Sequence, residues 1–464
     1  MLLAAALALA ALPPEAAMWA EAGYGFGADL PRPVATASVV AFGARPDDGR
    51  DDTEAFERAL ARGGVLSLPP GEFQLSRRLH ARQPGTVLLG AGSGSTILRF
   101  TRSLQDLDPR PAETATGEPT VHWSWAGGLL VFHGSGRPGA EVPLLPARRG
   151  DRHLRLGAPL ALAPGQEVSI LLRGDDGKRL ALHLYDGDAG DSEKLRSPRS
   201  VRMSARVDSA QGSEVRLASP LLLDLPAEFR PTLVVAGRPD AMGVRGVGFR
   251  LTTAPYRGHF KEDGWNALEF SGTRHAWADD IRFSGVDSGV FVGGDHVTLR
   301  DLVFAAARPA SREGYVGHHG VALGGCANRL ENFDFQVRFH HDITFSSWTN
   351  GNVVRAGFGK GLTLDFHKRG PFGNLVTQVG SGDGSTVFRT GGGPGLGRSA
   401  GAWNCFWGIR AREPLEWPPS SYAPSRATAF AGVEFVAAKR PPFEVRRLGP
   451  NEPLDLWIAA RRAR

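Results

Sequence analysis

The sequence is poor in cysteine and in long apolar runs. Only two cysteines occur among 464 residues, Cys326 and Cys405, so a disulfide-rich module and a cysteine-rich zinc domain are excluded. One disulfide between them and two buried free thiols both fit the sequence. Beyond the first 13 residues no long uninterrupted apolar run occurs, which excludes a protein built of membrane-spanning helices. We therefore expect no membrane as a partner.

Blocks of like charge are also missing. Lys and Arg total 54 against 48 Asp and Glu, and only six of the 54 are Lys. No five-residue block of one sign and no zinc-finger or RNA-recognition motif occurs, so we expect no nucleic acid as a partner. The arginine excess is interpreted as compositional bias. The net charge of +6 is nevertheless compatible with an acidic polysaccharide.

Glycine and proline are plentiful. The 60 Gly and 33 Pro make up about a fifth of the chain, without the three-residue glycine period of collagen. Apolar residues at 42% are enough for a large core. The composition favours a turn-dense architecture and leaves sandwich, barrel, propeller and solenoid open.

The N-terminus carries a candidate export signal. Met1 to Pro13 form an apolar run too short to span a bilayer, and Ala20-Glu21-Ala22 has the small-x-small pattern of a cleavage site. We predict a signal peptide over residues 1–22 and a secreted or periplasmic protein. The alternative is an N-terminal apolar helix.

Residues 39–100 have an ordered set of local signals. The apolar run Val39 to Phe42 is followed by an acidic turn, a helical pattern that begins near Asp52 and stops at Gly63-Gly64, and short apolar strands separated by turns. The Gly-Ala-Gly of residues 90–92 lacks the helix and distant acidic residue of a dinucleotide loop and indicates a turn.

This segment resembles the N-terminus of the pectate lyase superfamily. The resemblance is carried by Phe42-Gly43-Ala44, Asp51-Asp52-Thr53, Leu68-Pro69-Pro70-Gly71 and Gly90-x-Gly92, in that order. It implies an all-β fold, a right-handed parallel β-helix closed by a short N-terminal helix, but not a reaction. The galacturonase subgroup pattern and the classical pectate lyase calcium and arginine motifs are absent. No catalytic residue is carried over, and the subgroup stays open.

A repeat from Trp265 onward supports a solenoid. Aligned apolar positions Leu268, Val290, Val321, Ile343, Leu364 and Thr386 are 22, 31, 22, 21 and 22 residues apart. A second strand follows each, and four of these are preceded by asparagines that we expect to stack as an amide ladder: Asn328, Asn352, Asn374 and Asn404. Residues 136–237 break the period. We predict first coils over 39–135, an inserted β-rich region over 136–237, the main coils over 238–440 and a tail over 441–464.

The register predicts which side chains face outward. If Leu268 and its equivalents point inward, alternate residues form outward columns one coil apart, about 4.8 Å. His319 and His341 then face inward, and Gly289 and Gly320 leave room on the outward face. The predicted catalytic residues are His318, His340, Asp342, Asp365, His367, Lys368, Arg369, Arg389 and Tyr315. The predicted substrate-binding residues are Asp287, Glu269, Trp265, Trp348 and Asp383. A one-residue slip would exchange the faces.

Two reactions on a polysaccharide fit these residues. β-Elimination from a uronate needs a base, for which His318 or His340 qualifies, a proton donor such as Tyr315, and a cation to neutralise the carboxylate. Inverting hydrolysis needs two carboxyls about 6.5–9.5 Å apart, for which Asp342 and Asp365 qualify. We favour the lyase, with the hydrolase and a non-catalytic glycan-binding or adhesion protein as alternatives. No cofactor is firmly indicated. Calcium on Asp287, Asp342 or Asp365 is an option, and a monomer or small homo-oligomer is expected.

Overall fold

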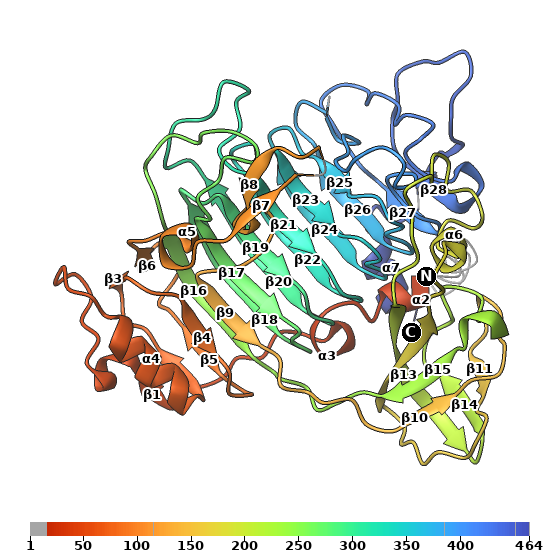
Figure 1. Cartoon of the computed structure of the whole chain (residues 1–464), viewed down its shortest axis with the longest axis horizontal. Helices are drawn as coiled ribbons and strands as arrows, with labels where there is room; N and C mark the ends of the chain where they lie inside the picture. Colours follow the sequence, from red (N-terminus) through yellow and green to blue (C-terminus); the bar gives the residue numbers. More distant parts are fainter. Residues whose placement is uncertain (1–15, 115, 385, 451, 464) are drawn as a thin grey trace.

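Two long parallel sheets form the body of the protein in this computed structural model (Figure 1), which describes residues 16–114, 116–384, 386–450 and 452–463. The larger sheet has 14 strands and the other has seven. The larger contains β1 (Ala37–Ser38), β2 (Val65–Ser67), β3 (Gly71–Leu75), β5 (Val87–Leu89), β6 (Thr96–Phe100), β16 (Gly243–Arg250), β18 (Trp277–Ser284), β20 (Thr298–Ala305), β22 (Arg329–Phe335), β24 (Val353–Gly359), β26 (Leu375–Gly380), β27 (Asn404–Trp407), β28 (Thr428–Ala431) and β29 (Val445–Arg446). The smaller contains β4 (Leu79–Ala81), β9 (Leu130–His133), β17 (Asn266–Ser271), β19 (Ser288–Val292), β21 (His319–Leu323), β23 (His341–Phe345) and β25 (Leu364–Phe366).

From β16 to β26 the chain alternates between these two sheets, so each of these coils adds one strand to each sheet. Leu268 pairs with Val290, Val290 with Val321, Val321 with Ile343 and Ile343 with Leu364. These are five of the six aligned positions of the sequence repeat, and their side chains fill the core between the sheets. The sixth, Thr386, lies in a turn. Stacked phenylalanines, such as Phe304 on Phe335 with ring centroids 4.0 Å apart, line the opposite side. The predicted right-handed parallel β-helix is confirmed.

The predicted asparagine ladder is also confirmed. The backbone N–H of Asn328 donates to Oδ1 of Asn352, that of Asn352 to Asn374, and that of Asn374 to Asn404, at 2.9–3.0 Å. All four side chains are buried at the turn that enters the larger sheet. Each side chain therefore satisfies a backbone donor of the neighbouring coil that no strand pairing reaches.

Helices cover one end and one face of the solenoid. At the N-terminal end, α4 (Thr53–Arg62) buries Phe56 against Phe73 of β3, with ring centroids 5.3 Å apart. On the outward face of the larger sheet, α2 (Ala16–Trp19) and α7 (Leu456–Arg462) pack together and bury Trp19 and Leu456 against Leu375 and Cys405. The other helices are α3 (Tyr24–Gly27), α5 (Leu104–Leu107) and α6 (Arg179–His183), with short 3-10 turns elsewhere. No helix of the described ranges has both the length and the apolar composition needed to cross a bilayer.

Only the end of the predicted signal peptide, residues 16–22, lies within the described residues. The apolar run Met1–Pro13 lies outside the described residues. The expected cleavage site lies inside them, where Ala20 and Ala22 are fully buried and Glu21 pairs with Arg206 and accepts a hydrogen bond from Ser219 at 2.7 Å. Residues 16–22 are therefore part of the packed fold of the whole chain. Secretion stays a prediction.

An antiparallel sheet of six strands projects from the solenoid and supplies the inserted β-rich region (Figure 1). Its strands are β10 (Glu141–Pro143), β11 (His153–Arg155), β12 (Glu167–Arg173), β13 (Ser200–Gln211), β14 (Glu214–Leu217) and β15 (Thr232–Val235), and a separate hairpin joins β7 (Pro111–Glu113) to β8 (Pro119–Val121). The sheet has its own apolar core, which includes Ile170, Met203 and Leu233. Both cysteines belong to the solenoid and are buried and free, so no disulfide joins them.

A buried carboxylate docks the inserted sheet on the solenoid. Glu167 of β12 pairs with Arg274 and lies 2.8 Å from Nε2 of His275, with His296 close behind. Burial alone would raise the pKa of Glu167, but the hydrogen bond from His275 and the nearby cationic groups outweigh it and lower the pKa to about 2. The ionised form is therefore bound more strongly in the folded state than in the unfolded chain.

We expect Glu167→Gln to destabilise the protein more at neutral than at acid pH. A carboxyl whose folded pKa lies below its unfolded value stabilises the fold above the unfolded value, near 4.5, and loses that contribution as pH falls toward about 2. The contribution is about 3 kcal/mol at most. Urea unfolding of wild type and variant at about pH 7 and about pH 3 measures it. Glu214→Gln, an exposed change on the same insert, is the control. An equal loss of unfolding free energy at both pH values would contradict the role given to Glu167.

Candidate active site

Six of the 13 histidines come together on the outward side of the seven-stranded sheet. We call His259, His318, His319, His340, His341 and His367 the histidine cluster. His319 and His341 are the first residues of β21 and β23 and pair directly across the two strands, while His318 and His340 precede them. Because the coils stack in register, the His-His doublet recurs one coil apart, with 5.2 Å between the ring centroids of His319 and His341. The repeat therefore brings the two doublets next to each other on adjacent coils.

The predicted register is wrong at the start of these strands. A Cβ added to Gly289 or Gly320 would overlap the rings of Phe304 or Phe335, so both glycines face the core and make room for phenylalanines. Asp342, one coil on from Gly320, is only 1% exposed. Its Oδ1 accepts the N–H of Phe339 at 2.9 Å and its Oδ2 accepts that of Thr363 at 2.9 Å. Position 342 therefore faces inward together with Ile343, and His341 faces the cluster.

Gly320→Ala is expected to destabilise the protein by about 1–3 kcal/mol, because the new methyl group must displace the Phe335 ring or the backbone of Asp342. Gly293→Ala in the same sheet is the control, since its nearest neighbour would lie at an ordinary 3.5 Å. Neither glycine has a positive φ, so the comparison isolates packing. Equal unfolding free energies for the two variants would contradict the inward position of Gly320 and favour the outward one.

Three rings of the cluster are sealed from solvent. His318 and His341 are each 2% exposed and His319 is 5% exposed. Burial, followed by the charges of neighbouring groups, lowers the pKa of His341 to about 4 and the pKa values of His318 and His319 well below the ordinary value. His319 is held by a 2.9 Å contact between its Nδ1 and Thr344 Oγ1. These rings are neutral at physiological pH.

A buried carboxylate lies at one end of the cluster. Asp365 of β25 is fully buried, and its Oδ2 lies 2.8 Å from Nδ1 of His367 and 3.3 Å from Nδ1 of His341. Its Oδ1 accepts the N–H of Gly391 at 2.6 Å. Burial would raise the pKa of Asp365, but the two imidazoles outweigh it and hold the pKa well below its usual range. Asp365 in turn outweighs the effect of burial on His367 and raises the pKa of that residue.

The open side of the cluster carries Tyr315, His340 and Arg389. Nη1 of Arg389 donates to the Tyr315 hydroxyl, and its Nη2 lies 3.0 Å from Nε2 of His340. The tyrosine and histidine rings meet edge to face, with centroids 5.3 Å apart. All three residues are half-buried. Burial, with further contributions from His341, His259 and Arg389, lowers the pKa of His340 to about 2 and keeps its ring neutral. A phenol, a neutral imidazole and a guanidinium thus share one partly exposed site.

The sequence did not reveal one central member, His259. It lies in the loop between β16 and β17, outside the repeat, and its ring stacks on His340 with centroids 3.8 Å apart. Glu262 of the same loop is 4% exposed, and its Oε1 lies 3.4 Å from Nδ1 of His318. Burial raises the pKa of Glu262 to about 7. No periodic signal places this loop, because its sequence does not recur in the other coils.

Several predicted site residues lie elsewhere. Asp287 is buried and pairs with Arg308 at 2.8 Å while accepting the N–H of Trp265. Glu269 pairs with Arg78 at 2.8 Å. Trp265 packs against the solenoid core, Trp348 packs against the core of the inserted sheet, and Asp383 is exposed on a loop. The structure gives none of these five a place in the cluster, and substrate binding by them stays a prediction.

The two basic residues after His367 lie at the edge of the site. Nζ of Lys368 donates to the carbonyl of Gly393 at 2.8 Å, and Arg369 is exposed. Both have positive φ values, 60° and 56°, which turn the chain away from β25. Among the predicted cations, Arg389 is therefore the one that contacts the histidine cluster through hydrogen bonds.

Potential metal ligands form two groups in the part of the chain that the structure describes. One is His259, His318 and His341, and the other is His341, Asp365 and His367. In each, one ligand atom per residue lies within 4.8 Å of the others. Neither contains Asp287 or Asp342, whose oxygens are occupied by Arg308 and by backbone N–H groups. The three carboxylates considered for calcium therefore do not converge into the oxygen cage that this ion needs.

Comparison with known proteins gives partial matches. No family model matches the chain. Pre-neck appendage proteins of Bacillus phages B103 and phi29 are 39% and 37% identical over 67 residues, which is 14% of this chain and 8% of each relative. The chain thus spans about 8% of the length of these curated relatives.

Solved structures resemble the chain over most of its length. The tailspike protein gp49 from Pseudomonas phage LKA1 has a TM-score of 0.45 and 13% identity, covering 81% of this chain and 64% of the tailspike. The tailspike gp61 of Pseudomonas phage phi297 has a TM-score of 0.39 and 14% identity, covering 83% and 69%. The A-module of the Azotobacter vinelandii mannuronan C-5 epimerase AlgE4 has a TM-score of 0.32 and 10% identity, covering 90% and 96%. Likenesses of this size carry no information on function.

Proposed function

We propose that this right-handed parallel β-helix protein is an enzyme that cleaves an acidic, uronate-containing polysaccharide by β-elimination. The observation that carries the proposal is the contact of Arg389 with both Tyr315 and His340 on the open side of the histidine cluster. These three groups supply what the reaction needs, and the structure brings them together from two separate loops and the approach to β23. The site lies on the lateral face of the solenoid, where Tyr315, His340 and Arg389 are partly exposed.

Each group has a definite task in this reaction. In the free protein Nη2 of Arg389 lies 3.0 Å from Nε2 of His340 and contributes to the low pKa of that ring. The uronate carboxylate takes Arg389 in place of this contact and offsets its charge, which frees the His340 ring to act as the base. The ring removes the proton from C5 of the uronate, and the electron pair left behind forms the double bond between C4 and C5. The C4–O bond of the glycosidic linkage breaks, and Tyr315 gives its hydroxyl proton to the leaving oxygen. Arg389 binds the carboxylate and stabilises the charge that spreads onto it when C5 loses its proton. His318, considered as an alternative base, is too deeply buried to touch substrate.

The position of Asp342 weakens the hydrolytic alternative. An inverting hydrolase needs an acid and a base that both reach the sugar. Asp342 faces the core and Asp365 is fully buried between two histidines. The alternative of a non-catalytic glycan-binding protein would use the same surface, and it differs from the lyase only in that the bound glycan is not cleaved. We propose secretion or periplasmic location as the setting in which a polysaccharide is met.

A panel of acidic glycans tests the proposal. Purified protein is incubated with polyuronates and sulfated or carboxylated polysaccharides, and both ultraviolet absorbance and reducing ends are followed. The proposal predicts that at least one glycan gives both signals together, since the unsaturated uronate absorbs. Reducing ends without absorbance would favour hydrolysis and overturn β-elimination. Binding with neither signal would identify a glycan-binding protein.

A further inference from the structure

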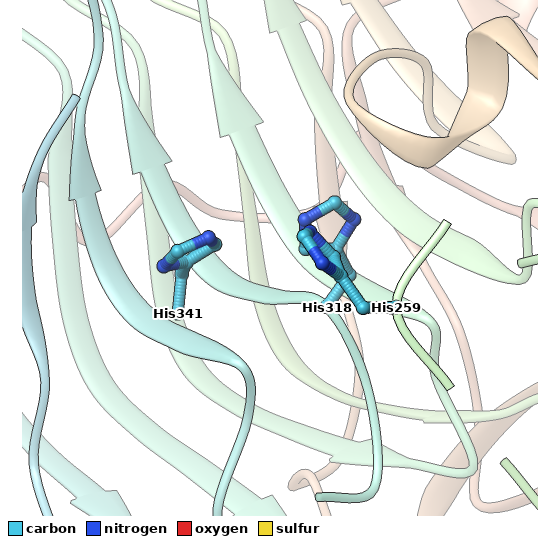
Figure 2. Close-up of side chains that lie close together, drawn as sticks. All are labelled: His259, His318 and His341. Atoms are coloured by element: carbon cyan, nitrogen blue, oxygen red, sulfur yellow. The ribbon is translucent and has the colours of Figure 1, made fainter. Parts of the chain in front are cut away.

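The strongest unassigned feature is the group formed by His259, His318 and His341. These residues come from three elements: the loop before β17, the residue preceding β21 and the first residue of β23. One ligand atom of each lies within 4.8 Å of the other two. Figure 2 shows the rings of His259 and His318 close together, with that of His341 to one side on the neighbouring strand. The three imidazoles are therefore brought together by tertiary packing and not by the local conformation of one segment.

The ring nitrogens at this point are not hydrogen-bonded. Nε2 of His259, Nδ1 of His318 and Nδ1 of His341 are buried without a hydrogen-bond partner. Leaving a polar atom buried and unpaired costs free energy, and no atom of the residues that the structure describes forms a hydrogen bond with these three nitrogens. A cation held by imidazole nitrogens would remove that cost. The rest of the cluster behaves differently, since His319 and His367 each have a close partner at 2.8–2.9 Å.

Two carboxylates lie beside the group. Glu262 Oε1 lies 3.4 Å from Nδ1 of His318, and Asp365 Oδ2 lies 3.3 Å from Nδ1 of His341. Glu262 is itself positioned by a 2.6 Å hydrogen bond from the Tyr256 hydroxyl. Both carboxylates face nitrogens that form no hydrogen bond with the described residues, so their charge would attract a cation to this point. The group therefore has negative charge next to it as well as converging nitrogens.

We propose that His259, His318 and His341 bind one divalent transition-metal ion of the zinc class. An all-imidazole set suits Zn²⁺, Co²⁺, Ni²⁺ or Cu²⁺ and not Ca²⁺ or Mg²⁺, which require oxygen ligands. Three protein ligands leave a position open for water or a ligand oxygen, as in zinc sites that take part in chemistry. The neighbouring set His341, Asp365 and His367 is less suited, because Asp365 is already engaged by His367 and by the N–H of Gly391.

Metal analysis of purified protein tests this inference independently of any glycan activity. The full chain, without a polyhistidine tag, is stripped with chelator, loaded with Zn²⁺ and passed over a desalting column before elemental analysis. Co²⁺ titration followed by visible absorption reports the coordination. The expected result is one ion per chain for the wild type, a visible Co²⁺ spectrum of tetrahedral or five-coordinate type, and no retention of Ca²⁺.

The variants distinguish the two ligand sets. His259→Ala changes a half-buried loop residue, so the fold should survive, and circular dichroism verifies this. It should reduce the bound metal from one ion per chain to none, whereas His367→Ala and the exposed His153→Ala should retain one. A wild type that holds no metal would overturn the inference. So would a His259→Ala protein that binds as the wild type does, or loss of metal in His367→Ala alone.

Discussion

Replacing Tyr315 with phenylalanine should reduce turnover of the acidic glycan by about 10²–10⁴-fold, the usual contribution of one positioned proton donor. The variant keeps the ring that meets His340 edge to face and that lies 5.3 Å from the Arg389 guanidinium. It loses only the hydroxyl that gives its proton to the leaving oxygen. Substrate binding should therefore change little, and the effect should appear in kcat rather than in KM. Initial rates of ultraviolet absorbance measure both constants.

Three further variants test this interpretation. His340→Ala removes the base and should lower kcat by a similar factor, while the double variant should lose little more, because residues that act as a unit are non-additive. Tyr24→Phe, a half-buried tyrosine at α3 with its ring near His275, should leave the rate unchanged. If Tyr315→Phe keeps the wild-type rate, the proton donor is another group and the proposed chemistry at this site is wrong.

Replacing Trp19 with alanine should lower the free energy of unfolding by about 3–5 kcal/mol, the cost of emptying a large buried site. Trp19 is 1% exposed, and its Nε1 donates to the carbonyl of Gly373 at 2.7 Å. It packs in the cluster that joins α2 and α7 to the final coils. Denaturant unfolding measures the loss. Trp125→Ala, at a site 36% exposed, should cost much less.

The same variant bears on processing of the N-terminus. Cleavage after Ala22 would remove Trp19 and leave the surfaces of Leu375 and Trp407 in that cluster uncovered. A large loss of stability in Trp19→Ala would therefore favour a mature chain that retains residues 16–22. A variant as stable as the wild type would contradict the role of α2 and would be consistent with cleavage after Ala22.

The sequence was sufficient to predict the coil. Leu268 and its equivalents recur at nearly constant spacing, and burial of one face sets the strand register strongly. The asparagines before the larger sheet were predictable for a similar reason, since four polar residues at equivalent turns have to satisfy equivalent backbone groups. The error occurred where the strands begin. Gly320 and Asp342 face inward next to Val321 and Ile343, and a period of two cannot represent two consecutive inward positions.

The site was partly predictable for a related reason. His318, His340 and Asp365 follow from the repeat. The sequence combines Tyr315 with His318 or His340 and with a cation from Lys368, Arg369 and Arg389, and the structure brings Tyr315, His340 and Arg389 into contact. The partnership of His341 with Asp365 was missed because His341 was assigned to the core. His259 was missed because its loop has no equivalent in other coils, so its position depends on tertiary packing against His340 and on no repeated pattern.

A crystal structure of the Tyr315→Phe protein with an acidic oligosaccharide tests the central claim most directly, because the slow variant retains its substrate. The account predicts a sugar on the outward side of β21 and β23, with a uronate carboxylate on the Arg389 guanidinium and C5 facing the ring of His340. An oligosaccharide bound elsewhere on the solenoid, with Arg389 still bonded to His340 and no sugar near it, would contradict the account.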